Sequence, residues 1–145
     1  MRISINTPDR LPLLSQTAEH ALRALLYLGQ HPDRGYVSAQ EIAEALGAPP
    51  NYLSKTLRVL TKRGVLRSVR GPHGGFALAM STADITPAMV VDAVDDVSVP
   101  ATCLLGNHPC DPDAPCAAHG RWSQLGRRVM EPLEGTSIAD LLAPS

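Results

Sequence analysis

Apolar residues recur at helical spacing along the first third of the chain and predict two helices. The first runs from Leu13 to about Gly29, where the glycine and a following proline indicate a stop. The second opens at the capping-box sequence Ser38–Glu41 and ends at Gly47. Residues 1–12 show little pattern and are predicted to be a tail.

A third helix, predicted from Pro49 to about Arg63, has two faces of opposite character. Proline is tolerated at its start because the N–H groups of a first helical turn lack intrahelical partners. On a helical wheel one side is suited to packing, and it carries Leu53, Thr56, Leu57 and Leu60. The opposite side carries Asn51, Lys55, Arg58 and Lys62. Amide and guanidinium groups can read base edges in a major groove, whereas ammonium groups mainly meet phosphates.

Two short strands are predicted directly after this helix, at Val65–Val69 and Phe76–Ala79. They flank a glycine-rich turn that also contains Arg70 and His73. Three helices followed by such a hairpin predict a winged helix-turn-helix, a mainly α fold with a small β-hairpin wing. At the tip of the wing Arg70 is placed to enter a minor groove, and His73 to touch phosphate.

The second half of the chain predicts further helices. One is capped at Thr86 and continues to Val94, a long one covers Ala117–Glu134, and Thr136–Leu142 adds a last turn. The long helix has an apolar stripe of Trp122, Leu125, Val129, Met130 and Leu133. This stripe predicts a twofold dimer, and an intramolecular core helix is the alternative.

The predicted organisation has four parts. They are a tail (1–12), a winged helix-turn-helix region (13–97), a cysteine loop (98–119), and a dimerisation helix with a C-terminal turn (120–145).

The net charge of −1 conceals a marked asymmetry. The segment Asn51–Gly75 holds six Lys or Arg and no acid, so it carries +6, and the rest of the chain carries −7. A basic segment on an acidic protein indicates a polyanionic partner such as double-stranded DNA, although a solvated charged face has the same composition.

Other features narrow the class of protein. No apolar run approaches the ~20 residues that span a membrane. The N-terminal residues have no apolar segment of the secretory type, so we expect a cytoplasmic protein without a membrane partner. No Ser/His/Asp set or phosphate-binding glycine loop is present, and we therefore expect no enzymatic activity.

Three cysteines form a C-x6-C-x5-C pattern at Cys103, Cys110 and Cys116, followed by His119. Thiolates are soft ligands that select iron–sulfur clusters, zinc or Cu(I). The spacing lacks the short pairs usual in structural zinc sites, and it does not match a c-type haem motif. The pattern favours a metal cofactor, and free redox-reactive thiols are the alternative.

Several stretches taken together resemble the Rrf2 family of winged-helix transcription regulators, which includes iron–sulfur and nitric-oxide-responsive members. The stretches are AEHALRALLYL, NYLSKTLRVLTKRGVLRSVRGPHGGFAL, ITPAMVVDAV and the three-cysteine loop that ends in CAAH. The likeness covers about residues 15–142. It implies a homodimer that binds a pseudo-palindromic operator, with the long helix packed on its partner and DNA affinity altered by cluster loss or change.

The resemblance also implies roles for individual residues. It places base contacts near Asn51, Tyr52 and Lys55 and makes the three cysteines cluster ligands. The fourth ligand varies within the family, and this chain has a candidate for each type: His119 after the last cysteine, or Glu19 from the first helix of the partner subunit. The N-terminus is longer than usual in the family. The x6 spacing differs from some members, so two-iron and four-iron clusters both stay open.

The sequence thus predicts a DNA-binding regulator, acting as a repressor, that senses redox state, nitric oxide or iron–sulfur status through its cluster. The same fold working through thiol oxidation or zinc is the main alternative. An iron–sulfur carrier or electron-transfer protein is a third, but such a protein needs no basic DNA reader.

Overall fold

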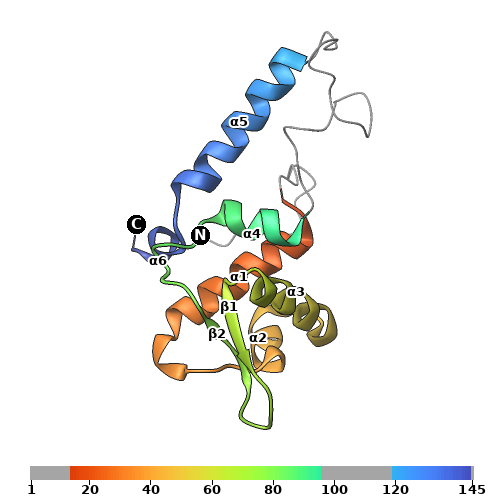
Figure 1. Cartoon of the computed structure of the whole chain (residues 1–145), viewed down its shortest axis with the longest axis vertical. Helices are drawn as coiled ribbons and strands as arrows, with labels where there is room; N and C mark the ends of the chain where they lie inside the picture. The colour runs from red at the N-terminus through yellow and green to blue at the C-terminus, as the bar shows by residue number, and fades with distance from the viewer. Residues whose placement is uncertain (1–13, 96–118, 145) are drawn as a thin grey trace.

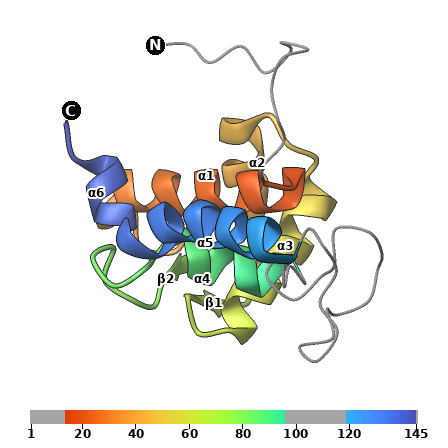
Figure 2. The same cartoon turned by 90° about the horizontal axis from the view of Figure 1, so that it is seen from above.

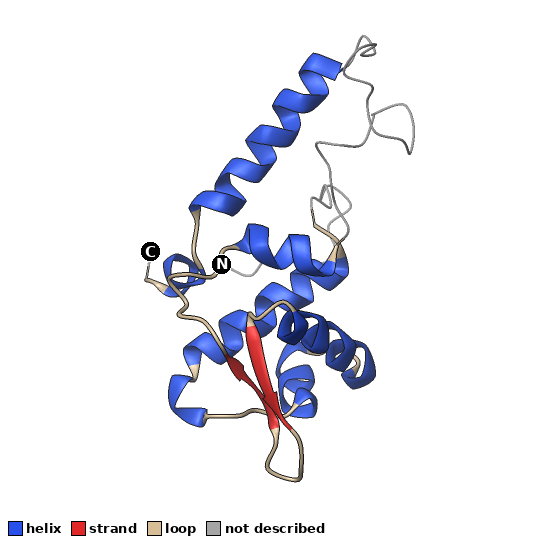
Figure 3. Ribbon diagram, viewed as in Figure 1, coloured by secondary structure: helices blue, strands red, loops and turns tan. Residues whose placement is uncertain are grey.

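The computed structural model describes residues 14–95 and 119–144, which form mostly helices with one two-stranded hairpin (Figures 1 and 3). In chain order the elements are α1 (Gln16–Gln30), a 3-10 turn η1 (Pro32–Arg34), α2 (Ala39–Leu46), α3 (Pro50–Lys62), β1 (Leu66–Val69), β2 (Gly75–Leu78), α4 (Pro87–Val94), α5 (His119–Gly135) and α6 (Ile138–Leu142). The predicted fold class, mainly α with a hairpin wing, is confirmed.

Most of the helices begin at a hydroxyl side chain that accepts a backbone N–H from the first turn, as N-caps do. These caps are Ser15 of α1, Ser38 of α2, Thr86 of α4 and Ser137 of α6. Helix α2 ends at Gly47 in the left-handed conformation, with φ 67° and ψ 30°, as glycine at this position predicts. Helix α3 differs, because Pro49 precedes it and no side chain caps it.

Helix α1 is the centre of the packing and contacts α2, α3, α4, α6 and β2. The core that these elements enclose is built from aliphatic side chains, among them Leu25, Ile42, Leu53, Leu57, Ile85 and Ile138. Viewed from above, α5 lies over α4, which it contacts (Figure 2). The hairpin tip and α5 therefore occupy opposite ends of the molecule (Figure 1).

The hairpin pairs β1 with β2 in antiparallel register, from Leu66 opposite Leu78 to Val69 opposite Gly75. The ends of both strands lie within one residue of the predicted bounds. Val37, just before α2, also pairs with Phe76 of β2 and so adds a bridge to the sheet. Neither this bridge nor η1 is predicted by the local sequence pattern.

The helices after the hairpin agree with the sequence to within two residues at most ends. Helix α5 continues through Pro132 to Gly135, and its predicted start at Ala117 lies outside the described residues. Helix α6 is shorter than predicted, because Ser137 caps it through a complete capping box with Asp140. The backbone and side-chain hydrogen bonds from Ser137 lower the pKa of the Asp140 carboxyl.

Candidate nucleic-acid interface

Helix α3 divides into the two faces that its sequence predicts. Its buried residues are Leu53, Thr56, Leu57 and Leu60, and its exposed polar residues include Asn51, Lys55, Arg58 and Lys62. The helix contacts α1, α2, α4 and β1 through the buried side. The amide and the cations are consequently presented to solvent on a helix that several elements hold from behind.

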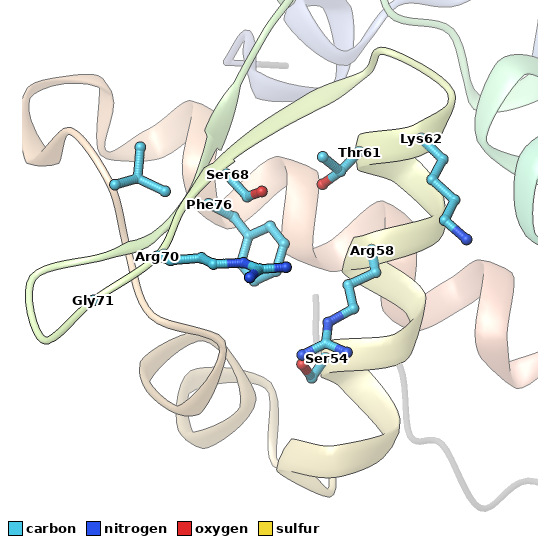
Figure 4. A pocket seen from close by; sticks show the side chains of 10 residues that line it. Ser54, Arg58, Thr61, Lys62, Ser68, Arg70, Gly71 and Phe76 are labelled. Carbon is cyan, nitrogen blue, oxygen red and sulfur yellow. The ribbon is translucent and has the colours of Figure 1, made fainter.

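A groove of about 550 Å³ separates α3 from the hairpin (Figure 4). Its lining residues are Ser54, Arg58, Thr61 and Lys62 of α3 and Ser68, Val69, Arg70, Gly71, Gly75 and Phe76 of the hairpin. The described residues that line it therefore include three cations and three hydroxyls but no carboxylate. Arg70 reaches from the hairpin toward α3, and the Arg58 guanidinium lies near Ser54 (Figure 4).

The hydroxyls of Ser54, Thr61 and Ser68 were not selected by sequence reasoning. On the helical wheel Ser54 and Thr61 fall between the apolar and basic sides of α3, and Ser68 belongs to a separate strand. Their common position becomes evident only when the hairpin folds beside the helix. Hydroxyl groups are frequent donors to phosphate oxygens, so Ser54 and Ser68 extend the hydrogen-bonding capacity of the groove. The Thr61 hydroxyl instead donates to the Leu57 carbonyl at 2.9 Å.

The six cations of the basic segment are not equivalent. Arg63 forms an exposed ion pair with Asp92 of α4, with an N···O distance of 3.6 Å. Arg67 lies over the ring of Tyr36, 5.7 Å from its centroid. These two arginines already have protein partners. The predicted readers Lys55, Arg58, Lys62 and Arg70 are all exposed, and the last three line the groove.

The tip of the wing has the geometry of a close-approach turn. Gly71 has φ 113°, a conformation that side chains beyond glycine rarely adopt. Arg70 and His73 are both exposed beside it.

Tyr52 lies differently from the other predicted DNA contacts. It is half-buried, and its hydroxyl forms a hydrogen bond with Thr17 Oγ1 of α1. The ring of His20, also on α1, meets the tyrosine ring edge-on at 5.7 Å between centroids and 75° between planes. Tyr52 is thus held against α1, whereas Asn51 and Lys55 project into solvent.

The predicted cluster ligands are only partly within the structure. Cys103, Cys110 and Cys116 lie outside the described residues, as does the side chain of His119. Glu19 is half-buried in the first turn of α1, one turn after Ser15. Within residues 14–95 and 119–144, no group of three His, Cys, Asp or Glu side chains is arranged to hold a metal ion.

The first turn of α1 is hydrogen-bonded to the residue that follows α4. Ser15 Oγ donates to the carboxylate of Asp95 at 2.6 Å. Glu19 therefore lies one helical turn from a residue that contacts the end of α4.

Comparison with known proteins is consistent with this geometry. Residues 14–144 match the family model of Rrf2, described as an iron-dependent transcriptional regulator. The chain belongs to the Rrf2 family. Its winged helix-turn-helix is therefore that of a DNA-binding transcription regulator.

The chain is also similar to individual transcription regulators of known sequence. It is 38% identical over 132 residues to a candidate HTH-type transcriptional regulator of Aquifex aeolicus, covering 90% of this chain and 91% of that protein. It is 34% identical to IscR of Aliivibrio salmonicida, over 89% of this chain and 76% of that one.

Solved structures agree on the fold. The structure of T. potens IscR superposes with a TM-score of 0.71 at 28% identity, covering 89% of this chain and 85% of that one. CymR, the global cysteine regulator of B. subtilis, superposes at 0.74 with 23% identity, covering 89% and 95%. In the parts of this Rrf2 protein that the structure describes, no helix is long and apolar enough to cross a membrane.

Proposed function

We propose that this Rrf2 protein binds a pseudo-palindromic operator with α3 in the major groove and the wing tip in the adjacent minor groove. Asn51 and Lys55 contact base edges, and Arg70 enters the minor groove, whose negative potential attracts arginine. Arg58, Lys62 and His73 meet the phosphates between these two sites. Each residue is exposed, and three of them, Arg58, Lys62 and Arg70, line the same groove.

The observation that carries this proposal is the groove between α3 and the hairpin. Arg58 and Lys62 on one wall and Arg70 on the other concentrate positive charge, with no carboxylate among the described residues of the lining. A duplex backbone that passes between a major-groove helix and a minor-groove wing presents phosphates at this position. An ordinary solvated helix would not require a second, independent element to contribute a cation to the same groove.

A selection experiment tests this proposal, because it identifies the operator sequence in the course of the measurement. A pool of random-sequence duplexes is exposed to the purified full-length protein, and the retained fraction is sequenced over several rounds. We expect enrichment of inverted half-sites whose centres are one helical turn apart, about 10 base pairs, or a multiple of that distance. Retention without any sequence enrichment would refute specific DNA recognition.

For the sensing function we propose an iron–sulfur cluster held by the thiolates of Cys103, Cys110 and Cys116. The chemistry of this donor set supports the assignment, because three soft thiolates suit such a cluster and leave one position for a different donor. When bound, the cluster supplies a centre whose stability responds to oxidants, nitric oxide or iron supply. The description of the Rrf2 family model as iron-dependent favours this choice over zinc or thiol oxidation.

His119 and Glu19 remain the two candidates for the fourth donor, and we favour His119. It lies three residues after Cys116, so it can reach the same cluster from within one subunit. Imidazole is also a more common donor to such clusters than a carboxylate. Glu19 is the alternative, and as a ligand from the partner subunit it would connect the cluster directly to α1.

Anaerobic reconstitution of His119→Ala and Glu19→Ala separates the two candidates. We expect the visible and Mössbauer spectra to change in His119→Ala and to stay like those of the parent protein in Glu19→Ala. The reverse result would assign the site to Glu19. A colourless wild-type protein that binds zinc would instead support a zinc site. A colourless protein that forms disulfides would support sensing by thiol oxidation.

The same proposal includes a homodimer formed through α5. Leu125 is 51% exposed on this helix, and Val129, Met130 and Leu133 are only partly buried. These residues recur at spacings of three and four, so they lie along one side of the helix. A twofold pair of subunits would cover this side and present two α3 helices to an inverted repeat.

A further inference from the structure

The contact between Tyr52 and α1 gives the DNA reader a support that the family assignment does not explain. Tyr52 lies in the first turn of α3, and its neighbour Asn51 is exposed. The Tyr52 hydroxyl bonds to Thr17 Oγ1, while the His20 ring meets the tyrosine ring edge-on. His20 is itself only 9% exposed, so the tyrosine rests against a buried wall of α1.

His20 takes part in this wall as a ring rather than as a hydrogen-bonding group. Its Nδ1 is buried and has no hydrogen-bond partner among the described residues. A buried polar atom without a partner costs free energy. We infer that packing of the His20 ring offsets this cost. The His20 ring packs against one side of the Tyr52 ring, and the Thr17 hydroxyl bonds to the hydroxyl at the end of the Tyr52 side chain.

The start of α3 needs such a support because it has no other polar anchor of the usual kind. Hydroxyl caps hold the first turns of α1, α2, α4 and α6, whereas α3 begins at Pro49 without a side-chain cap. Yet this end carries Asn51 and Lys55, the proposed base readers. Bidentate contacts to base edges tolerate only small displacements, so mobility of this turn would weaken specific recognition.

We propose that Tyr52 is a positioning residue, and that Thr17 controls specific operator affinity through it without touching DNA. Thr17 and His20 act as a latch that holds the first turn of α3 at the angle that base contacts require. The inference rests on the proposed DNA-binding function. It reassigns Tyr52, which the family resemblance places among the base contacts, from reading the operator to holding the reader.

Three substitutions isolate the latch. Thr17→Val keeps the shape of the side chain and removes its hydroxyl, Thr17→Ser restores a hydroxyl, and Tyr52→Phe removes the other partner. One neutral hydrogen bond of this kind corresponds to a roughly three- to tenfold change in an equilibrium. We expect Thr17→Val and Tyr52→Phe each to weaken binding to the selected operator by this factor, and Thr17→Ser to retain wild-type affinity.

The double variant gives the sharpest readout. If both substitutions break the same bond, Thr17→Val/Tyr52→Phe should bind the operator no more weakly than either single variant. Affinity for a random-sequence duplex should stay near the wild-type value, because the phosphate contacts do not change. The melting temperature should fall only by the few degrees that the loss of one hydrogen bond causes. A merely structural role would instead lower the affinities for the operator and for the random duplex together.

A measurement without DNA distinguishes failure of the latch from failure of the proposed function. Hydrogen exchange of the Leu53 amide, which bonds to the Pro49 carbonyl at 3.0 Å, should become faster in Thr17→Val and Tyr52→Phe and stay at the wild-type rate in Thr17→Ser. Unchanged exchange and unchanged operator affinity in Thr17→Val would overturn the latch, even if the wild type binds specifically. A loss of affinity in Tyr52→Phe alone would also overturn it, since the hydroxyl would then act on DNA directly.

Discussion

Val37 and Phe76 exchange two backbone hydrogen bonds, with N···O distances of 2.9 and 2.8 Å. This bridge joins the segment before α2 to β2, so it attaches the wing to the helical body. Gly75 lies directly beside it, and a Cβ on that residue would stand 2.2 Å from the Val37 carbonyl oxygen. The attachment therefore depends on the absence of a side chain at position 75.

Gly75→Ala should accordingly destabilise the protein and displace the wing. The contact is with backbone, which cannot move aside as a flexible side chain would. We expect the free energy of unfolding to fall by roughly 1–3 kcal/mol, as for other overpacked sites. Denaturant titration measures this change. The matched control is Gly135→Ala, where nothing lies within 4 Å of the added Cβ; an equal loss of stability in both variants would refute the explanation.

The comparison of sequence with structure shows which kinds of interaction a local pattern encodes. The two faces of α3 were predicted correctly because burial there follows the helical period from Leu53 to Leu60. The Ser38 cap and the Gly47 stop were predicted because their chemistry is local. The bridge from Val37 to Phe76 was missed because it joins residues far apart in the chain.

The candidate site was only partly predictable for the same reason. The sequence identifies the exposed cations, but it cannot show that Arg63 pairs with Asp92 or that Arg67 covers Tyr36. It also grouped Tyr52 with its neighbours, since the bond to Thr17 depends on how α1 packs against α3. The assignments to the three cysteines stay predictions, because these residues lie outside the described part of the chain.

Removal of a base-reading side chain should relax sequence specificity. We expect Lys55→Ala and Arg70→Ala each to weaken binding to the selected operator by roughly 1–3 kcal/mol. Affinity for random duplexes should fall much less. Fluorescence anisotropy with a labelled operator and a labelled random duplex measures the ratio of the two affinities. Unchanged operator affinity in both variants would remove these residues from the interface.

Phosphate contacts should be recognisable by their salt dependence. Arg58→Ala and Lys62→Ala should weaken binding to all duplexes similarly and reduce the slope of log K against log salt by about one each. Arg121→Ala is the charge-matched control, because this exposed arginine lies on α5, at the opposite end from the wing. A slope that falls equally in the control would indicate a general charge effect instead of contacts within the groove.

Disruption of the apolar side of α5 should dissociate the proposed dimer without unfolding the subunit. Burial of one large apolar side chain contributes about 1.5–3 kcal/mol, and Leu125→Glu reverses this contribution at each of two symmetric positions. We expect the dimer dissociation constant to rise by roughly a hundredfold or more, measured by sedimentation equilibrium. Gln124→Glu, on an adjacent exposed residue, introduces the same charge and should leave the dimer intact. A wild-type monomer at micromolar concentration would contradict the proposal at once.

We propose that a cluster on the three cysteines controls an operator-binding surface formed by α3 and the wing. The most direct test measures the affinity of one anaerobic preparation for its selected operator before and after the cluster is removed. We expect visible absorption that disappears with the cluster and an affinity change within the usual range of allosteric coupling, roughly 5- to 150-fold. We also expect Cys116→Ala to behave like the cluster-free protein from the start. A colourless preparation whose operator affinity is unaffected by the treatment, or a Cys116→Ala variant that keeps a normal cluster, would contradict it.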